Sequence, residues 1–453
     1  MSFPRYPAHK DSGVEWLGEV PEHWDVKPLK RLAEIQTGLA KGKEVEPEGS
    51  IEVPFLRVAN VQDGFLDLND IHTIQIPEAA LDRYLLRPGD VLMNEGGDFD
   101  KLGRGCIWNS EIRPCIHQNH VFAVRPHSIS SAWLNVYTSS KQANSYFIGR
   151  SKQSTNLASI SSSNLMDLPV PVAPIVESTQ ILNFLDRETA KIDTLIYEQH
   201  RLIVLLQEKR QAVISRAVTK GLNPDVPMKD SGVEWLGEVP EHWDVSYLVK
   251  QSDLLQTGPF GSQLCVEDYV TGGIPVINPS SIIGSNIVAI EGVGVADETA
   301  FRLERHKLRK GDLVVARRGE MGRCAVVGEN ETGWLCGTGC LLLRCATSFS
   351  PDYVELVIKS EYSRATLSLS SVGSTMENLN TSILGRLRVP VPPKEDQVAI
   401  LGYLQQSERC FESLITDASN AIRLLEERRS ALISAAVTGQ IDVLSLVSEA
   451  VAA

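Results

Sequence analysis

Three cysteines and two histidines are the residues whose spacing most readily suggests chemistry. Cys336, Cys340 and Cys345 lie in GWLCGTGCLLLRC, and His117 and His120 lie in CIHQNHVF. Zinc sites favour cysteines separated by two to four residues, together with a second pair of ligands. The alternating pattern around these cysteines instead favours buried strand positions, and we expect the histidines to make polar contacts or to fill a core. We therefore predict neither a metal site nor a catalytic role for these residues.

The sequence also lacks the motifs of several large enzyme classes. It contains no GxxxxGK[ST] phosphate loop, no GxGxxG fingerprint between a strand and a helix, no GxSxG elbow and no HExxH motif. Asn278-Pro279 is followed by two serines, so it lacks the aromatic residue that a base-flipping methylase carries after its Asn/Asp-Pro-Pro. We expect no catalytic residue in this chain.

Length and composition indicate an ordinary globular protein of about three domains, or of two domains with a connecting element. The chain has 453 residues, of which 43% are hydrophobic and 22% charged, and these values exclude a wholly disordered or fibrous protein. No stretch approaches the roughly 20 apolar residues that span a bilayer, and MSFPRYPAHKDSG lacks the apolar segment of a secretory signal. We expect a cytoplasmic protein with free thiols and no membrane partner.

The chain contains a long internal repeat. Residues 10–26 read KDSGVEWLGEVPEHWDV, and residues 229–245 repeat them without a change at an offset of 219. A unit of this length indicates a duplicated domain, because solenoid repeats have periods of about 20 to 50 residues. The same offset relates residues 168–185 to 387–404 and residues 208–219 to 427–438.

Two variable regions interrupt the repeat. Residues 27–151 and 246–370 are hardly similar, except that LRPGDVLMNEGG from Leu86 matches LRKGDLVVARRG from Leu308. The net charge of −13 is concentrated in the constant parts, since each 17-residue copy alone carries −4. A nearly neutral variable domain with basic residues on one face can still bind DNA. We therefore expect the constant parts to meet one partner twice and the variable regions to meet two different targets.

Each constant part includes a segment with the pattern of a long amphipathic helix. Apolar residues recur at steps of four and three over more than four turns, which is typical of a coiled-coil seam. Pro174 and Pro393 precede the two segments, and Gly221 and Gly439 follow them. We predict an antiparallel coiled coil of two helices of about 40 residues, roughly 60 Å long; separate packing of each helix on its own domain is the alternative. The predicted seam positions are Ile181, Leu185, Glu188, Ile192, Leu195, Gln199, Leu202, Leu206, Lys209 and Val213, and Ile400, Leu404, Ser407, Phe411, Leu414, Ala418, Ala421, Leu425, Arg428 and Leu432.

The variable regions are rich in short runs typical of strands, such as HVFAVRP and GDLVVARRG. We predict an α+β fold in which two mixed, strand-rich domains are separated by two long helices that form the coiled coil, with an internal pseudo-two-fold duplication. The predicted division is a repeated segment at 1–26, a first variable domain at 27–170, a helix at 171–222, a repeated segment at 223–245, a second variable domain at 246–389, a helix at 390–442 and a tail at 443–453.

Several motifs together resemble those of one known family. They are SGVEWLGEVPEHW in two copies, the proline-rich start of each long helix and the GD[VL] strand of each variable region. LLQTGPFGSQL, EGGDFDKLGRG and CIHQNHVF add to them. The chain resembles, over nearly its whole length, the specificity subunit of type I restriction-modification enzymes. It departs from the usual helix starts, because Glu177-Ser178 stands where Glu-Gln is usual and Ala173 replaces a proline that is present as Pro392.

The resemblance implies a recognition role without catalysis. In such subunits two target recognition domains each read one half of a bipartite, asymmetric site in double-stranded DNA, and the paired helices set the spacer. The constant parts dock two methylation subunits, and two restriction (motor-nuclease) subunits join that core. S-adenosylmethionine, ATP and magnesium belong to those partner subunits, and no cofactor is expected in this chain.

Four of the seven tryptophans lie in the identical segments. Aromatic residues are enriched at protein interfaces, so these tryptophans are candidates for the contact with the partner subunits. The alternative is that they anchor each domain to its helix, and both roles are compatible with the sequence. The four residues are Trp16, Trp24, Trp235 and Trp243.

The candidate DNA contacts are polar residues on glycine-rich loops and strand ends. Arg and Lys recognise guanine, and Asn and Gln recognise adenine. If Arg317 or Arg318 contacts a base, its replacement by alanine weakens DNA binding by about 1–3 kcal/mol. The predicted contacts are Asn94, Lys101, Arg104, Gln118, Asn119, Gln153, Ser154 and Asn156 in the first region, and Ser262, Gln263, Arg317, Arg318, Arg323, Ser374, Thr375 and Asn378 in the second.

Three other functions are compatible with the sequence. A solitary DNA-modifying enzyme with an unrecognised site would modify or cut DNA without partners. A coiled-coil scaffold would have no need of two different targets, and the divergence of the variable regions argues against it. A recognition subunit of a related DNA-modifying or phage-exclusion system would share the same layout.

Overall fold

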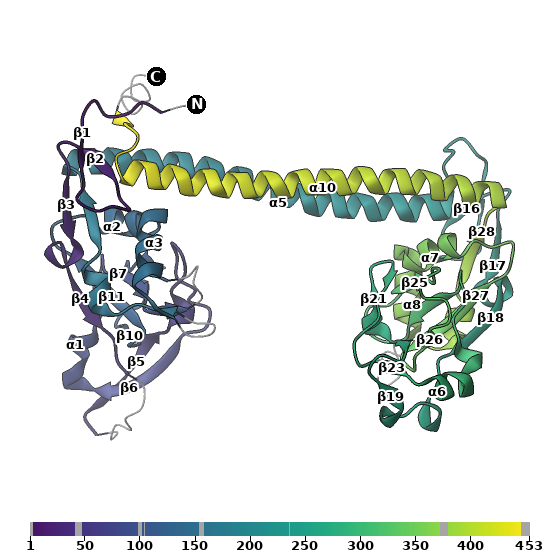
Figure 1. Cartoon of the computed structure of the whole chain (residues 1–453). Helices are drawn as coiled ribbons and strands as arrows, with labels where there is room; N and C mark the ends of the chain where they lie inside the picture. The colour runs from purple at the N-terminus through teal and green to yellow at the C-terminus, as the bar shows by residue number, and fades with distance from the viewer. Residues whose placement is uncertain are drawn as a thin grey trace. The chain divides into compact units, whose positions relative to one another are not determined.

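The chain folds into two compact units, each with one strand-rich domain and part of both long helices (Figure 1). Unit 1 comprises Met1–His200 with Asn420–Ala453, and unit 2 comprises Arg201–Ser419. This mixed architecture confirms the predicted α+β class with two strand-rich domains. Among the described helices, none is both long enough and apolar enough to cross a membrane. The computed structural model describes residues 3–40, 48–97, 102–103, 105–153, 158–234, 236–371 and 379–444.

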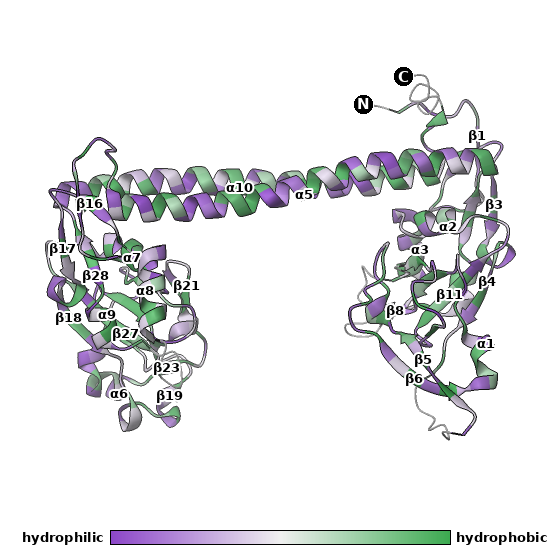
Figure 2. Cartoon of the chain, turned by 180° about the vertical axis from the view of Figure 1, so that it is seen from behind, coloured by the Kyte–Doolittle hydropathy of each residue, from purple (hydrophilic) through white to green (hydrophobic). Residues whose placement is uncertain are grey.

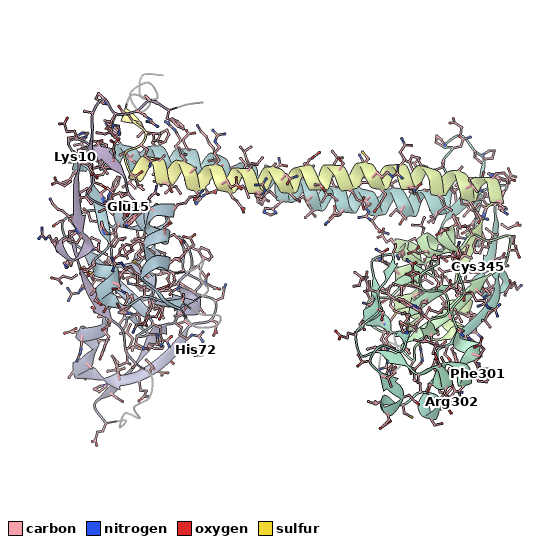
Figure 3. The ribbon with its side chains drawn as sticks, in the orientation of Figure 1. Lys10, Glu15, His72, Phe301, Arg302 and Cys345 are labelled. Atoms are coloured by element: carbon pink, nitrogen blue, oxygen red, sulfur yellow. The ribbon has the colours of Figure 1, made fainter. Side chains whose placement is uncertain are left out.

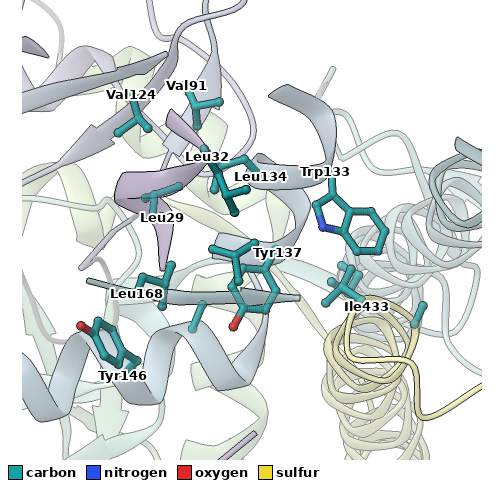
Figure 4. Close-up of a cluster of buried hydrophobic side chains, with 14 of the residues drawn as sticks. Leu29, Leu32, Val91, Val124, Trp133, Leu134, Tyr137, Tyr146, Leu168 and Ile433 are labelled. Carbon is teal, nitrogen blue, oxygen red and sulfur yellow. The ribbon is translucent and has the colours of Figure 1, made fainter. Parts of the chain in front are cut away.

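The domain of unit 1 is built on a four-stranded antiparallel sheet. Helices α2 and α3 cover it, and Trp133 and Tyr137 of α2 pack in one core with Val91 and Val124 of the sheet (Figure 4). A second sheet holds β5 between β10 and β6, with β10 parallel to β5. The first sheet has the order β4 (Ala33–Thr37), β11 (Val121–Pro126), β7 (Val91–Asn94), β9 (Gly105–Ile107); the other elements are β5 (Ser50–Leu56), β6 (His72–Pro77), β10 (Ile116–His117), α2 (Ser131–Thr138) and α3 (Lys141–Arg150).

The domain of unit 2 repeats this plan. Its antiparallel sheet and its parallel strand pair have the same order as those of unit 1. Helices α7 and α8 contribute Tyr353 and Leu367 to a core with Leu313 and Leu341. The four-stranded sheet is β18 (Ser252–Thr257), β27 (Cys340–Cys345), β24 (Leu313–Ala316), β25 (Cys324–Val326); the parallel pair is β20 (Ile274–Ile277) with β26 (Leu335–Cys336), and the helices are α7 (Pro351–Lys359) and α8 (Glu361–Ser371).

Two helices connect the domains, α5 (Ile175–Lys220) and α10 (Lys394–Val437). In unit 1 the start of α5 shares a core with the end of α10, which includes Ile181 and Ala436. In unit 2 the end of α5 shares a core with the start of α10, which includes Ala217 and Ile400. Both helices show alternating hydrophobic and hydrophilic faces (Figure 2). The pairing is antiparallel, as predicted.

The seam differs from the prediction in its phase. Leu195, Leu202 and Leu414 were expected inside, but they are 50%, 42% and 44% exposed. An undistorted helix has 3.6 residues per turn, so a strict 3.5-residue repeat drifts across its surface. In both helices the positions that face inward compensate for this drift by two successive steps of four residues. These steps occur at the same place in the two copies of the repeat. The half-buried residues are therefore Ile196, Ile203 and Ile415, and Arg210 and Arg429 replace Lys209 and Arg428 at the inner face.

The repeated segment holds the start of one long helix in each unit. Trp24 is fully buried, and its indole nitrogen donates to Glu177 Oε1 in the first turn of α5 at 3.0 Å. Trp243 is 1% exposed and donates to Asp396 Oδ2 in the first turn of α10 at 2.7 Å. The contacts of these two tryptophans therefore agree with the alternative in which they anchor each domain to its helix. Trp16 is 37% exposed beside Tyr146, and Trp235 lies outside the described residues.

The same segment also closes the end of the other long helix. In unit 1, Gly439 follows α10 in a left-handed conformation and lies against Pro21 and Trp24. In unit 2, Gly221 follows α5 in the same conformation and lies against Pro240 and Trp243. Figure 3 labels Lys10 and Glu15 of the segment in unit 1. The identical sequence is thus explained by an identical task at the two ends of the helix pair.

Candidate nucleic-acid interface

Three separate segments meet at one edge of the sheet in unit 1. The backbone nitrogen of Glu95, directly after β7, donates to the carbonyl of His120 in the turn before β11, at 2.9 Å. The nitrogen of Ile160 donates to the carbonyl of Glu95 at 2.8 Å. The short strands β8 (Gly96–Gly97), β13 (Ala158–Ser159) and β12 (Lys152–Gln153) extend this edge. Asn94, Gln118, Asn119 and Gln153, which were predicted as DNA contacts, are thereby brought to one place.

Unit 2 repeats these hydrogen bonds with other side chains. The nitrogen of Arg317 donates to Gly339 O at 2.9 Å, and the nitrogen of Leu379 donates to Arg317 O at 2.8 Å. Gln118 N in unit 1 and Gly337 N in unit 2 each donate, at 2.8 Å, to the carbonyl of the residue that ends the neighbouring strand. The same pattern of backbone hydrogen bonds therefore holds one set of side chains in unit 1 and a different set in unit 2. The equivalent positions are Asn94 and Ala316, Glu95 and Arg317, Gly96 and Arg318, Gln118 and Gly337, Asn119 and Thr338, and His120 and Gly339.

A buried aspartate paired with a half-buried arginine joins two neighbouring strands behind this edge in both units. Asp90 is fully buried and accepts two hydrogen bonds from Arg125, at 2.7 and 2.8 Å. Asp312 is 1% exposed and accepts two from Arg344, both at 2.7 Å. The hydrogen bonds to the aspartates raise the pKa of both arginines. Both aspartates belong to the GD[VL] motif, which is the sequence signal of this ion pair.

A glycine packs the end of the first sheet strand against the turn. Gly38 follows β4, and a side chain there would overlap the carbonyl oxygens of His117 and Gln118. Gly258 follows β18, and a side chain there would overlap the carbonyl of Gly337. Only glycine permits this close approach. Sequence reasoning missed both positions, although Gln-Thr-Gly occurs at the same place in each variable region.

The predicted contacts in unit 1 differ in their exposure. Asn94 is 4% exposed, and its amide nitrogen donates to the carbonyl of Val61 at 3.0 Å, so this donor is already used inside the domain. Gln118 and Asn119 are half-buried at the edge. Beside them, His120 Nδ1 lies 2.7 Å from Glu95 Oε2. Among the predicted contacts of this unit whose side chains are described, Gln118 and Asn119 are thus the more exposed.

The predicted arginines of unit 2 have different surroundings. Arg317 is half-buried, and its guanidinium donates to the carbonyls of Leu379 and Thr338 at 3.1 and 3.3 Å. Arg318 is exposed, and the half-buried Arg323 donates to the Arg318 carbonyl at 3.4 Å. Arg317 therefore joins two loops, whereas Arg318 is exposed at the domain surface. Ser262 and Gln263 are exposed in a short helix, Gly261–Gln263, after Gly258.

Several predicted contacts lie outside the described residues, and their assignment stays a prediction. For Gln153 only the backbone is described, as part of β12. The residues outside are Lys101, Arg104, Ser154, Asn156, Ser374, Thr375 and Asn378.

The residues first considered for chemistry lie in the cores or pair locally. Cys336 and Cys340 are buried on β26 and β27, as predicted, and burial raises the pKa of Cys340 to about 12. His117 is buried, its Nδ1 donates to Val121 O at 2.6 Å, and burial lowers its pKa to about 4. Within the described ranges, no three His, Cys, Asp or Glu side chains are grouped as metal ligands.

Comparisons with known proteins agree with this fold. Residues 242–423 match the family model described as type I restriction modification DNA specificity domain. The type I restriction enzyme EcoBI specificity subunit of Escherichia coli is 23% identical over 453 residues, covering 95% of this chain and 89% of that protein.

Two solved structures share the architecture at 14% sequence identity. One is described as the structural basis underlying complex assembly and conformational transition of the type I R-M system; its TM-score is 0.67, with 92% of this chain and 98% of that chain covered. The other, the HsdS subunit from Thermoanaerobacter tengcongensis, gives a TM-score of 0.54 with 93% and 98% covered. The resemblance stated from the sequence motifs is confirmed.

Proposed function

We propose that this chain, a relative of the type I restriction-modification specificity subunits, reads the DNA sequence for such a complex. Each strand-rich domain binds one half of a bipartite, asymmetric site in double-stranded DNA. The observation that carries the proposal is the edge of each sheet, where matching backbone hydrogen bonds hold different side chains. A backbone arrangement that stays constant while its exposed residues differ is suited to two domains that recognise different DNA sequences.

The side chains at the two edges suit different bases. In unit 2 the exposed Arg318 can donate two hydrogen bonds to guanine, whereas its counterpart in unit 1 is Gly96. In unit 1 the amides of Gln118 and Asn119 suit adenine, whereas their counterparts are Gly337 and Thr338. We therefore expect two unlike half-sites, with a guanine contact made by unit 2.

The remaining parts of the chain serve assembly and spacing in this proposal. The α5–α10 pair sets the number of base pairs between the half-sites, and the constant parts dock two methylation subunits, joined by two restriction subunits. S-adenosylmethionine, ATP and magnesium act in those partners, and this chain supplies no catalytic group of its own.

The test is to co-express the chain with a type I methylation subunit and to map methylated bases in the host DNA. The expected result is a split, asymmetric motif with a fixed gap. Exchange of residues 27–170 with 246–389 is then expected to exchange the half-sites. A stable complex that methylates no defined motif would refute the recognition function and leave the scaffold alternative.

A further inference from the structure

The two units differ at the anchor of the long helix. In unit 1, Tyr6 covers the anchor: its hydroxyl donates to Glu177 Oε1 at 2.6 Å, and its ring centroid lies 6.0 Å from that of Trp24 and 5.7 Å from that of His23. His23 Nε2 lies 2.7 Å from the other carboxylate oxygen. The Glu177 carboxylate therefore has three partners, one of them a phenol.

Among the described residues of unit 2, no tyrosine hydroxyl donates to the carboxylate of the same anchor, and the Tyr353 hydroxyl donates to the carbonyl of Val218 instead. Trp243 Nε1 and His242 Nε2 lie 2.7 and 2.8 Å from Asp396 Oδ2, as Trp24 and His23 contact Glu177. Glu22 N donates to Ala8 O at 3.1 Å in unit 1, and Glu241 N donates to Pro227 O at 2.8 Å in unit 2. This equivalence sets the register, in which the repeat position of Tyr6 is Asp225.

A cavity of about 200 Å³ lies at this anchor in unit 2. It is lined by Gly221, Pro240, His242, Trp243, Asp396 and Ile400 among others. Several of these are the repeat counterparts of the residues around Tyr6. Protein cavities of about 150 Å³ accept a molecule the size of benzene, so a phenol ring has room here.

We propose that this cavity of unit 2 binds a tyrosine side chain supplied by a partner protein. The ring would lie beside Trp243, and the hydroxyl would donate to Asp396, as Tyr6 does to Glu177. All ten tyrosines of the chain are among the described residues, and none lines the cavity. The tyrosine must therefore come from another polypeptide. The duplication thus leaves one anchor completed within the chain and the other open to a partner.

The cavity is tested on the full chain with p-cresol, the analogue of the tyrosine side chain. In ¹⁹F NMR of protein labelled with 5-fluorotryptophan, we expect p-cresol to shift the Trp243 signal saturably and to leave Trp24 unchanged. Toluene, which lacks the hydroxyl, is expected to bind roughly tenfold more weakly. Tyr6→Ala opens the equivalent space in unit 1, so Trp24 then responds as well. A Trp24 response in that variant without a Trp243 response in the parent chain would overturn the proposal.

A matched pair of variants checks that the response comes from this cavity. Ala399 lines the cavity, and its repeat counterpart in unit 1 is Gln180. Ala399→Phe is expected to abolish the Trp243 response, whereas Gln180→Phe keeps it. An unchanged response in Ala399→Phe would refute binding at this position.

The nature of the partner rests on the proposed function, under which it is the methylation subunit. In the co-purified complex we expect p-cresol to leave Trp243 unshifted, because the partner's tyrosine occupies the cavity. A full response in the complex would overturn the partner assignment while leaving DNA recognition intact. Sedimentation of the chain alone tests whether a second copy fills the cavity, and we expect the chain to be a monomer. Self-association that Ala399→Phe abolishes would assign the cavity to a second copy and refute the proposal.

Discussion

Arg317 and Arg318 are neighbours in the chain, yet their surroundings predict different effects of substitution. Arg318→Ala removes an exposed cation and is expected to weaken DNA binding by about 1–3 kcal/mol without changing the free energy of unfolding. Arg317→Ala removes two hydrogen bonds that join loops and is expected to cost about 1–2 kcal/mol of stability. DNA titrations at several salt concentrations and urea unfolding separate the two effects. Equal behaviour of both variants in both assays would contradict this division.

The buried aspartates give a prediction about stability. Asp312→Ala leaves Arg344 without its partner and the Arg309 amide without an acceptor, so we expect a loss of about 3 kcal/mol. Glu329→Ala, which breaks the exposed pair with Lys310, is the control in the same unit and is expected to cause no measurable change. Urea unfolding of the two variants compares these effects. A similar small loss in both would show that the buried pair does not hold the strand.

His117 predicts a pH dependence confined to unit 1. Burial lowers its pKa from the ordinary 6.5 to about 4, so between these values the unfolded chain binds more protons than the folded one. The stability present above pH 6.5 is therefore lost as the pH falls towards 4, by up to about 3 kcal/mol. Hydrogen exchange of β7 and β11 amides is expected to show this loss, and His117→Gln to reduce it. Identical pH profiles for the parent and the variant would exclude His117 as the cause.

At the scale of elements, the change of phase in the long helices can be tested on adjacent residues. Ile196 packs against the core of unit 1, whereas Leu195 is half exposed. Ile196→Ala is expected to destabilise unit 1 by roughly 1–2 kcal/mol and Leu195→Ala by less than about 1 kcal/mol, in proportion to the apolar surface each buries. Thermal unfolding measures both. A larger loss of stability for Leu195→Ala than for Ile196→Ala would support the strict seven-residue seam predicted from the sequence.

The helices show which features a sequence can predict. Their existence, pairing and ends follow from apolar spacing and from Pro174, Pro393, Gly221 and Gly439, because these signals are local. The residues that face inward at the middle of each helix do not follow from the sequence. Leucine and isoleucine are adjacent there, and only packing determines which of the two is buried. The same limit applies at the sheet edge, where Asp90 and Gly38 act through residues distant in the chain.

The sequence was informative about the candidate site in a different way. Residue types suited to bases identified Arg318 and Gln118, which the structure leaves exposed or half-buried at the sheet edge. The same criterion selected Asn94 and Arg317, whose donors bond to backbone carbonyls of their own domains. Hydrogen-bonding capacity can be read from a sequence, but whether the protein already uses it depends on tertiary structure. The match between the two GD[VL] motifs aligned one segment of each edge, whereas the equivalence of Gln118 with Gly337 is given by the backbone hydrogen bonds.

At the scale of the whole molecule, the proposed spacing role predicts a change in the DNA gap. Removing seven residues at matching levels from α5 and α10 keeps the seam in phase and shortens the pair by about 10 Å, at 1.5 Å per residue. B-DNA rises about 3.4 Å per base pair, so we expect a gap shorter by about three base pairs and unchanged half-sites. Methylation mapping of the co-expressed complex measures both. Removing seven residues from α5 alone breaks the pairing and is expected to abolish methylation. An unchanged gap after the matched deletion would mean that the helices do not determine the distance between the half-sites.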